Sequence, residues 1–231
     1  IDAHVHVVPT PQSMERAVRI FDRMGVRTWI SLNDGSVNQQ RFWGHVEMAK
    51  RYRGRHYFFA NIDWRGHGRR GFIAKTVRRL EAAVKYGARG LKVFKHFGLG
   101  LVDRNGELVR VDDPRFDPIW QKAGQLGIPV AFHTADPLAF FQPTSPQNER
   151  YAELSLMPEW SFHGDDYPEH DILLEQRNRI FARHPKTRFI GVHLANYPER
   201  LDIVTQWLEQ HPNLTVNIAA RVPEIGRHHP C

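Results

Sequence analysis

The chain has 231 residues, of which 41% are hydrophobic and 25% are charged, and its formal net charge is +7. This composition is typical of a folded globular protein with a sizeable core, in one large domain or two small ones, and it excludes an intrinsically disordered chain. No uninterrupted apolar run approaches the roughly 20 residues that a transmembrane helix needs, so we expect no membrane partner.

The positive charge does not by itself indicate nucleic-acid binding. The basic residues are scattered over predicted helix surfaces, and the densest cluster, 65–70, is interrupted by glycines and a histidine. A solvated basic surface accounts for this pattern, and the functional alternative is electrostatic steering of an anionic small substrate. We therefore expect a small-molecule substrate and no nucleic-acid partner, while self-association into a homo-oligomer stays open.

The two ends of the chain bear on its compartment. Cys231 is the only cysteine and can form no internal disulfide, which is compatible with a reducing compartment. The chain begins at Ile1 rather than at a methionine, which indicates that an upstream segment has been removed and leaves room for a lost signal or transit peptide. The localisation is therefore undetermined, with the cytoplasm as the default expectation.

Predicted strands and helices alternate along the chain, with short connections between them. Runs rich in β-branched and aromatic residues predict the strands, and apolar residues at helical spacing predict the helices. The predicted strands are 2–8, 26–32, 56–62, 89–95, 128–134, 187–194 and 213–219. The predicted helices are 12–24, 38–52, 71–86, 114–125, 171–184 and 198–210.

Repeated β-α units of this length indicate a parallel sheet, either a (β/α)8 barrel or a doubly wound open sheet. No glycine-rich dinucleotide or phosphate-loop signature follows any predicted strand, which argues against a nucleotide-binding sheet. The rhythm breaks at 135–170, which is rich in proline, aromatic and polar residues. A long irregular segment inside a compact domain usually carries function, so we expect 135–170 to be a lid over the active site.

Histidines stand at the ends of three predicted strands. His4 and His6 are two residues apart in the first strand, so their imidazoles share one face. His133 lies near the end of the fifth strand and His193 near the end of the sixth. Each histidine alone would be ordinary, but the carboxyl ends of barrel strands converge on one face. The set therefore favours the barrel and predicts a divalent metal, zinc or a similar ion, which imidazoles bind well.

Lys92 is a further candidate in the fourth strand. Leu91 and Val93 share the parity that should face the outer helices, so Lys92 is expected to face the interior of the barrel. An interior lysine needs a partner. It could bind a substrate carboxylate, pair with an acidic side chain or, once carbamylated, bridge two metals, and the sequence leaves these alternatives open.

These motifs together resemble the amidohydrolase superfamily. The Ile-Asp-Ala-His-Val-His opening, the Gly-Leu-Lys-Val fourth strand, the Ala-Phe-His-Thr fifth strand and the Gly-Val-His-Leu sixth strand carry the resemblance, which spans nearly the whole chain. The chain is most similar to the amidohydrolase-related branch, which contains hydrolases and aromatic-acid decarboxylases similar to aminocarboxymuconate-semialdehyde decarboxylase. The resemblance implies that His4, His6 and His133 ligate the principal metal, and that His193 ligates a second metal or orients water or substrate.

The sequence departs from that family at its C-terminal end. The family closes its site with an aspartate after the eighth strand, whereas this chain reaches Cys231 just after the seventh. Asp63 and Asp136 lie near strand ends, but neither occupies the family's position. We therefore expect one domain over 1–231, a (β/α)8 barrel that lacks its eighth strand and leaves the first and seventh strands with open edges. A further strand ending in an aspartate is expected about 30–50 residues beyond. The alternative is a degenerate relative without full chemistry.

Three classes of function follow from these residues. The leading hypothesis is a metal-dependent hydrolase that uses metal-activated water on an amide, ester or lactone, with His193 or Lys92 polarising the carbonyl oxygen. The second is a metal-dependent decarboxylase of an aromatic or enolic acid, for which Arg221 would suit an anionic substrate. In either enzyme, Phe141 and Trp160 of the predicted lid are expected to contact the substrate. The third is a metal-binding relative without catalysis.

Overall fold

The computed structural model describes residues 1–228, so Cys231 lies outside the described part of the chain. The described residues form two compact units. The first unit consists of Ile1–Val93, Arg115–Ala131 and Lys186–Arg188. The second consists of Phe94–Pro114, Phe132–Pro185 and the chain from Phe189 onward. The chain therefore passes between the units several times, and each unit is described in turn.

The first unit contains a parallel three-stranded sheet in the order β1-β2-β3. Its strands are β1 (Asp2–Val5), β2 (Trp29–Ser31) and β3 (His56–Phe58). The strands run parallel because a helix lies between each consecutive pair, namely α1 (Pro11–Arg23) and α2 (Gln40–Arg51). Among the described strands β1 pairs only with β2, which agrees with the open edge expected for the first strand.

Helix α1 shows how local sequence determines an element in this unit. The side chain of Thr10 caps its N-terminus by accepting from the backbone N–H of Ser13, and Pro11 occupies the first turn. Met14 and Ala17 face the core, and Gly25 follows the helix with a φ of 66°. The predicted helix at 12–24 is thus confirmed to within one residue at each end.

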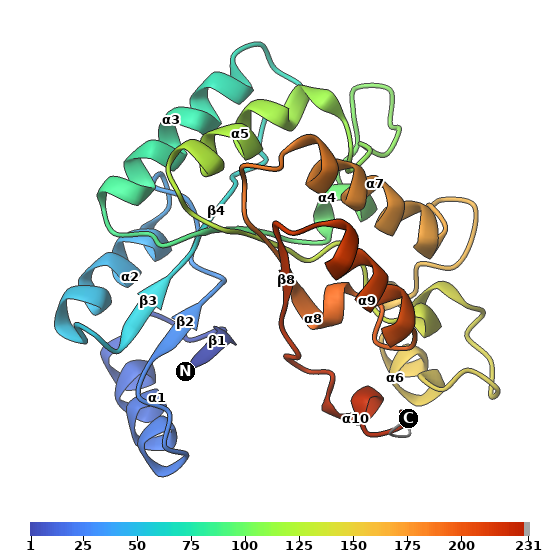
Figure 1. The fold of residues 1–231 in the computed structure, drawn as a ribbon, viewed down its shortest axis with the longest axis horizontal. Helices are drawn as coiled ribbons and strands as arrows, with labels where there is room; N and C mark the ends of the chain where they lie inside the picture. The colour runs from blue at the N-terminus through green and yellow to red at the C-terminus, as the bar shows by residue number, and fades with distance from the viewer. Residues whose placement is uncertain (229–231) are drawn as a thin grey trace. The chain divides into compact units, whose positions relative to one another are not determined.

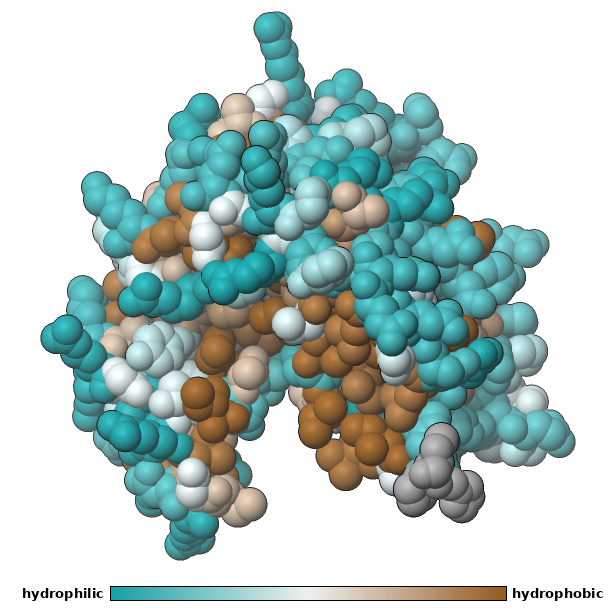
Figure 2. All heavy atoms as spheres, viewed as in Figure 1, coloured by the Kyte–Doolittle hydropathy of each residue, from teal (hydrophilic) through white to brown (hydrophobic). Residues whose placement is uncertain are grey.

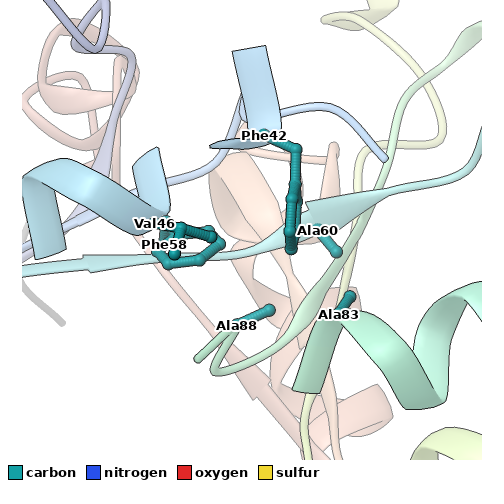
Figure 3. Close-up of a cluster of buried hydrophobic side chains, with 6 residues drawn as sticks. All are labelled: Phe42, Val46, Phe58, Ala60, Ala83 and Ala88. Atoms are coloured by element: carbon teal, nitrogen blue, oxygen red, sulfur yellow. The ribbon is translucent and has the colours of Figure 1, made fainter. Parts of the chain in front are cut away.

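A cluster of buried apolar side chains joins the strands and helices of this unit (Figure 3). The rings of Phe42 on α2 and Phe58 on β3 meet edge to face, with centroids 5.5 Å apart. The short strand β4 (Ala60–Asn61) continues the β3 segment beyond Phe59. Ala83 of helix α3 (Phe72–Lys85) completes the cluster, so this core holds both helices against the sheet.

The next strands and helices along the chain follow the same alternating plan. Strand β5 (Leu91–Val93) pairs in parallel with β4, and strand β6 (Val130–Phe132) comes next in the sheet order. Between them, the 3-10 helix η1 (Pro114–Phe116) leads into helix α5 (Asp117–Gln125), which lies beside α3 (Figure 1). Both helices bury one face, α3 with Leu80 and α5 with residues such as Ile119. The predicted strands at 89–95 and 128–134 are confirmed in shorter form.

The second unit contains the parallel strands β7 (Phe189–Gly191) and β8 (Leu214–Val216). Its helices are α4 (His96–Leu99), α6 (Tyr151–Leu156), α7 (His170–Arg183), α8 (Val192–Ala195), α9 (Leu201–Gln210) and α10 (Val222–Ile225). Figure 1 shows α8 packed beside β8 and α9. Helices α7 and α9 confirm the predictions at 171–184 and 198–210 within a few residues.

The segment 135–170 contains no long helix, as predicted from its composition. Its regular parts are the 3-10 helix η2 (Leu138–Phe141), α6 and the 3-10 helix η3 (Pro158–Trp160). The amide of Asn148 donates to the carbonyl oxygens of Ala139 and Pro143, at 2.8 and 3.1 Å. These hydrogen bonds and the buried side chain of Leu154 give the segment a defined conformation without a helix-length repeat.

The surface in Figure 2 shows hydrophobic side chains gathered near β8 and the segment that leads to α10. Ile218 and Val222 in that segment are 55% and 66% exposed. Strand β8 has one described neighbour, β7, so its other edge carries no described strand. Within residues 1–228, no helix has the length and apolar composition required to cross a membrane.

Candidate active site

The imidazoles of His4 and His6 lie together at the carboxyl end of β1. Their ring centroids are 5.2 Å apart and their planes meet at 71°. The pairing follows from the two-residue repeat of a strand, as predicted. The backbone N–H of Leu32 donates to the carbonyl of Val5 at 3.0 Å, so the chain after β2 runs alongside this pair.

The electrostatic surroundings of His6 favour its neutral form. Its pKa lies below the usual value because neighbouring atoms desolvate the ring, although the residue as a whole is exposed, and because Lys92 adds positive charge. The carboxylate of Asp34 acts in the opposite direction and Arg41 lowers the pKa further. A neutral imidazole is the form that binds a metal ion.

Lys92 is buried in the middle of β5, with 1% of its surface exposed. Burial lowers the pKa of its ammonium group to about 7, so charged and neutral forms both occur near neutral pH. The strand reaches this depth because Gly90 has no side chain: a Cβ atom there would lie 2.4 Å from the ring of Phe59. The effect of Lys92 on the pKa of His6 places this buried amine near the His4–His6 pair within the first unit.

The second unit holds the other two histidines. His133 follows the last residue of β6, and His193 lies in α8 directly after β7; their ring centroids are 4.7 Å apart. His133 Nε2 is 3.4 Å from Asp136, whose other carboxylate oxygen pairs with Lys95. Burial by itself would raise the pKa of Asp136, but His133 and Lys95 outweigh it and lower the pKa to about 2. Asp136 is therefore ionised at neutral pH.

A left-handed turn positions His193. The four residues from His193 to Asn196 have φ between 53° and 59°, a conformation that costs about 1–3 kcal/mol for each residue other than glycine. Gly191 permits the turn, since a Cβ atom there would lie 2.8 Å from the Cβ of Ala195. Strain of this size is characteristic of functional sites, where the surrounding structure holds it in place.

Side chains and strands around the turn supply the compensating contacts. The Leu194 N–H donates to the backbone oxygen of Asn217 at 2.7 Å, and the His193 N–H donates to the Asn217 side chain at 3.1 Å. The guanidinium of the fully buried Arg177 donates to the carbonyl of Ala195. His193 Nδ1 lies 2.7 Å from the carbonyl oxygen of Ala219, so Nδ1 carries the proton and Nε2 is the nitrogen that can act as ligand or acceptor.

These donors suit a divalent metal that prefers imidazole. Each unit presents two neighbouring imidazoles in or just after its parallel strands, and a carbonyl orients the ring of His193 as in protein metal sites. Within residues 1–228, no group of three or more His, Cys, Asp or Glu side chains is gathered closely enough to hold a metal. The structure thus brings together His4 with His6 and His133 with His193. The prediction that His4, His6 and His133 bind one metal together stays a prediction.

The predicted substrate contacts lie in the second unit and differ in their surroundings. Phe141 is buried and packs against Phe162 at 5.4 Å between ring centroids, while Lys95 Nζ lies 5.0 Å from the centroid of the same Phe162 ring. Phe141 is thereby linked through Phe162 and Lys95 to the His133 cluster. Trp160 lies in η3 and is 39% exposed, and Arg221 forms an ion pair with the buried Glu224.

Sequence reasoning missed several polar residues that lie near the candidate histidines of the two units. Lys95 was not selected, and Asp136 was noted near a strand end but given no role. Asp34, which influences His6, follows β2 by three residues and was also overlooked. The available signal was their position, because each of the three lies within a few residues of the carboxyl end of a strand.

The family model described as amidohydrolase matches residues 1–230. The chain belongs to the amidohydrolase family. This confirms the resemblance carried by the histidine and lysine motifs, and it places the chain in a family whose members are enzymes. None of the curated proteins matches the chain.

Solved structures similar to this amidohydrolase establish its fold class. An uncharacterized TIM-barrel protein from Bordetella bronchiseptica has a TM-score of 0.55 and 16% identity, and the match covers 91% of this chain and 62% of that protein. A 2,6-dihydroxybenzoate decarboxylase from Rhizobium has a TM-score of 0.56 and 16% identity, with 95% and 78% covered. The same kind of enzyme complexed with 2,6-dihydroxybenzoate has a TM-score of 0.54 and 17% identity, with 89% and 68% covered.

Structural similarity at this level of sequence identity shows a shared fold alone. The fold class is α/β, of the TIM-barrel type, which the histidines at the predicted strand ends had favoured over a doubly wound sheet. All seven predicted strands are present in the described residues, with the third divided into β3 and β4 at Phe59. The chain spans 62% of the length of the Bordetella protein that it matches.

Proposed function

We propose that this amidohydrolase is a metal-dependent hydrolase that acts on an amide, ester or lactone bond. The observation that carries the proposal is the pair of neighbouring imidazoles in each unit, His4 with His6 and His133 with His193. A divalent ion such as zinc, when bound, would lower the pKa of a water molecule and so supply a nucleophile at neutral pH. The ligands that we assign are His4, His6 and His133.

His193 has the features of a group that orients the substrate or the water. The left-handed turn fixes its backbone, and the carbonyl of Ala219 fixes its tautomer. Its Nε2 is therefore an acceptor with a defined direction, suited to taking a proton from water; once protonated, it could donate to a developing oxyanion. This fixed geometry supports a catalytic role for His193, because a pre-oriented group loses little entropy during the reaction.

Lys92 supplies a buried amine whose charge depends on pH. With a pKa of about 7 it can donate a hydrogen bond to a carbonyl or carboxylate oxygen of the substrate when it is protonated. In its neutral form it is an amine that can be carbamylated. The hydrolase proposal assigns it the first role, polarisation of the substrate oxygen, and carbamylation would appear as an added mass on the intact protein.

The segment 135–170 is proposed to cover the site as a lid. Phe141 and Phe162 line a pocket of about 320 Å³ in this segment. Phe162 also packs on Lys95, which is joined to His133 through Asp136. Aromatic walls beside a polar cluster are typical of small-molecule sites, so we assign substrate contacts to Phe141 and, at the more exposed edge, to Trp160.

The second candidate reaction is decarboxylation of an aromatic or enolic acid. It is favoured by the similar fold of the 2,6-dihydroxybenzoate decarboxylases. Lys95 lies near His133 and could contact an anionic substrate, but in the structure it pairs with Asp136. Arg221 could add a further contact to an acid, but in the structure it pairs with Glu224, which reduces its availability. Hydrolysis and decarboxylation use the same proposed metal ligands and differ in the bond that breaks.

Product analysis tests the proposal. Zinc-loaded full-length protein is incubated with a panel of lactones, amides, esters and aromatic carboxylic acids, and products are identified by mass. Addition of one water supports hydrolysis, and loss of carbon dioxide supports the second candidate. His193→Ala should abolish turnover, whereas His67→Ala, whose ring contacts the carbonyl of Trp64 away from the candidate residues, should retain it. Stoichiometric zinc without turnover on any member of the panel would refute both reactions and favour the non-catalytic relative.

A further inference from the structure

A buried polar network lies beside the end of β2 in the first unit. Its four members are Ser31, Asp34, His45 and His56, and none is more than 1% exposed. They come from β2, the loop after it, α2 and β3. Burying four polar side chains is costly unless they satisfy one another, so such a network usually serves a specific arrangement rather than stability alone.

The polar contacts of this network lead from His56 through His45, and from Ser31, to the carboxylate of Asp34. The hydroxyl of Ser31 donates to Asp34 Oδ1 at 2.7 Å. His45 Nε2 lies 2.7 Å from the same oxygen. The other ring nitrogen of His45, Nδ1, is 3.1 Å from His56 Nε2. The carboxylate of Asp34 accepts the Ser31 hydroxyl and is the end point of these contacts.

The far end of the network is uncharged. Burial and, after it, the charge of His45 lower the pKa of His56 to about 3, so His56 is neutral at neutral pH. His45 therefore has a neutral ring on one side and the carboxylate of Asp34 on the other. A ring N–H directed at the carboxylate is the arrangement found in other buried Asp–His pairs.

The backbone places Asp34 at the edge of the sheet where the histidines of β1 lie. The Leu32 N–H bonds the Val5 carbonyl at 3.0 Å, and the Gly35 N–H bonds the Asn61 side chain at 2.6 Å. Asp34 is thus held between the ends of β1 and β4.

One oxygen of Asp34 is left without a donor. Among residues 1–228, no group hydrogen-bonds the buried Oδ2 atom. Burying a carboxyl oxygen away from water and from donors costs free energy and calls for an explanation beyond core packing. A positive charge that joins the site only when it is loaded would provide that compensation.

We propose that Asp34 is a positioning residue whose fixed negative charge favours a divalent cation on His4 and His6, and that Ser31 and His45 hold its carboxylate for this purpose. The proposal rests on the metal dependence proposed above and extends it to a residue outside the assigned ligands. The alternative is that the network only ties α2 to β2 and β3. That alternative predicts a loss of stability on mutation without a selective loss of metal affinity.

The test measures zinc affinity of the full-length protein by competition with a chromophoric chelator. Asp34→Asn should weaken zinc binding by about 10- to 100-fold, the range found when residues that support metal ligands are changed. The matched control is Glu47→Gln on α2, which also removes one carboxylate but lies at the surface in a pair with Lys50. The control should bind zinc as the wild type does.

A conservative replacement separates positioning from simple packing. His45→Gln keeps an N–H donor for Asp34 and should retain zinc affinity within a few-fold, whereas His45→Leu should lose about tenfold or more. Equal zinc affinity in Asp34→Asn and Glu47→Gln would overturn the proposal. If Asp34→Asn does not fold, the comparison of His45→Gln with His45→Leu tests the proposal instead. Equal zinc affinity in these two variants would overturn the proposal.

The same titrations distinguish failure of this inference from failure of the proposed function. Zinc that binds the wild type and is lost in His4→Ala, but is unaffected by Asp34→Asn, would refute only the role of Asp34. A wild type that binds no zinc would refute the metal-dependent function and this inference together. Thermal unfolding of each metal-free variant shows whether a lost affinity reflects a lost fold.

Discussion

Replacing the buried Lys92 with methionine should remove a strong pH dependence of stability. The side chain is 1% exposed, and burial lowers its pKa from 10.5 to about 7. An unfolded chain regains the ordinary lysine pKa. Between pH 7 and about 10.5 the unfolded state therefore binds a proton that the folded state does not, so this residue makes stability rise with pH across that window.

The magnitude follows from the size of the pKa shift. Each pKa unit corresponds to about 1.4 kcal/mol, so holding the protonated amine in the folded protein below pH 7 costs on the order of 5 kcal/mol. A rise in pH from 6 to 9 ends two units above the pKa of Lys92 in the folded protein. It should therefore recover about 3 kcal/mol of this cost. Lys92→Met never carries the charge, and so its stability advantage over the wild type should shrink by about that amount between the two pH values.

Urea unfolding at pH 6 and pH 9, extrapolated to water, measures the free energy of unfolding of both proteins. Buffers depleted of bicarbonate keep the amine of Lys92 from being carbamylated. The control is Lys75→Met, because Lys75 is exposed on α3, and its difference from the wild type should be the same at both pH values. If the difference between Lys92→Met and the wild type is also independent of pH, the buried, low-pKa lysine is refuted.

Three further predictions concern the second unit. His133→Ala should lower zinc content measured by elemental analysis, whereas His67→Ala should not, and equal zinc in both would refute the ligand assignment. Shortening 135–170 should change the Michaelis constant or the substrate preference more than the zinc content, and lost zinc with unchanged preference would argue against a lid. Arg177→Met should lower the free energy of unfolding by about 1–3 kcal/mol, because the buried carbonyl of Ala195 loses its donor. An unchanged urea midpoint would contradict that role.

The sequence alone was sufficient for the order and type of the elements. Each predicted strand and helix depends on a local repeat, of two residues for strands and 3.6 for helices. The predicted strands at 2–8 and 187–194 are present in shorter form as β1 and β7, and residues 192–194 of the second prediction belong to α8 instead. The pairing of His4 with His6 was predictable for the same reason. Their spacing and the strand repeat are both local, so no distant residue was needed to orient them.

The placement of His133 and His193 was predictable only in part. The strand pattern put both at carboxyl ends of parallel strands, and the structure brings their rings to 4.7 Å. The left-handed turn that holds His193 carries no comparable signal, because Leu194 and Ala195 ordinarily avoid positive φ. That conformation persists only because Arg177 and Asn217, which are distant in the sequence, supply the hydrogen bonds that offset its strain.

The properties that define the site's chemistry were decided by the tertiary structure. The sequence shows a lysine at position 92, but its pKa depends on the burial that Phe59 and the surrounding elements impose. The network at Asp34 is likewise invisible in the sequence, since His45 reaches the carboxylate from α2 and His56 reaches His45 from β3. Charge and proton position depend on the distance between groups and on exclusion of water, and both are set only when separate segments pack together.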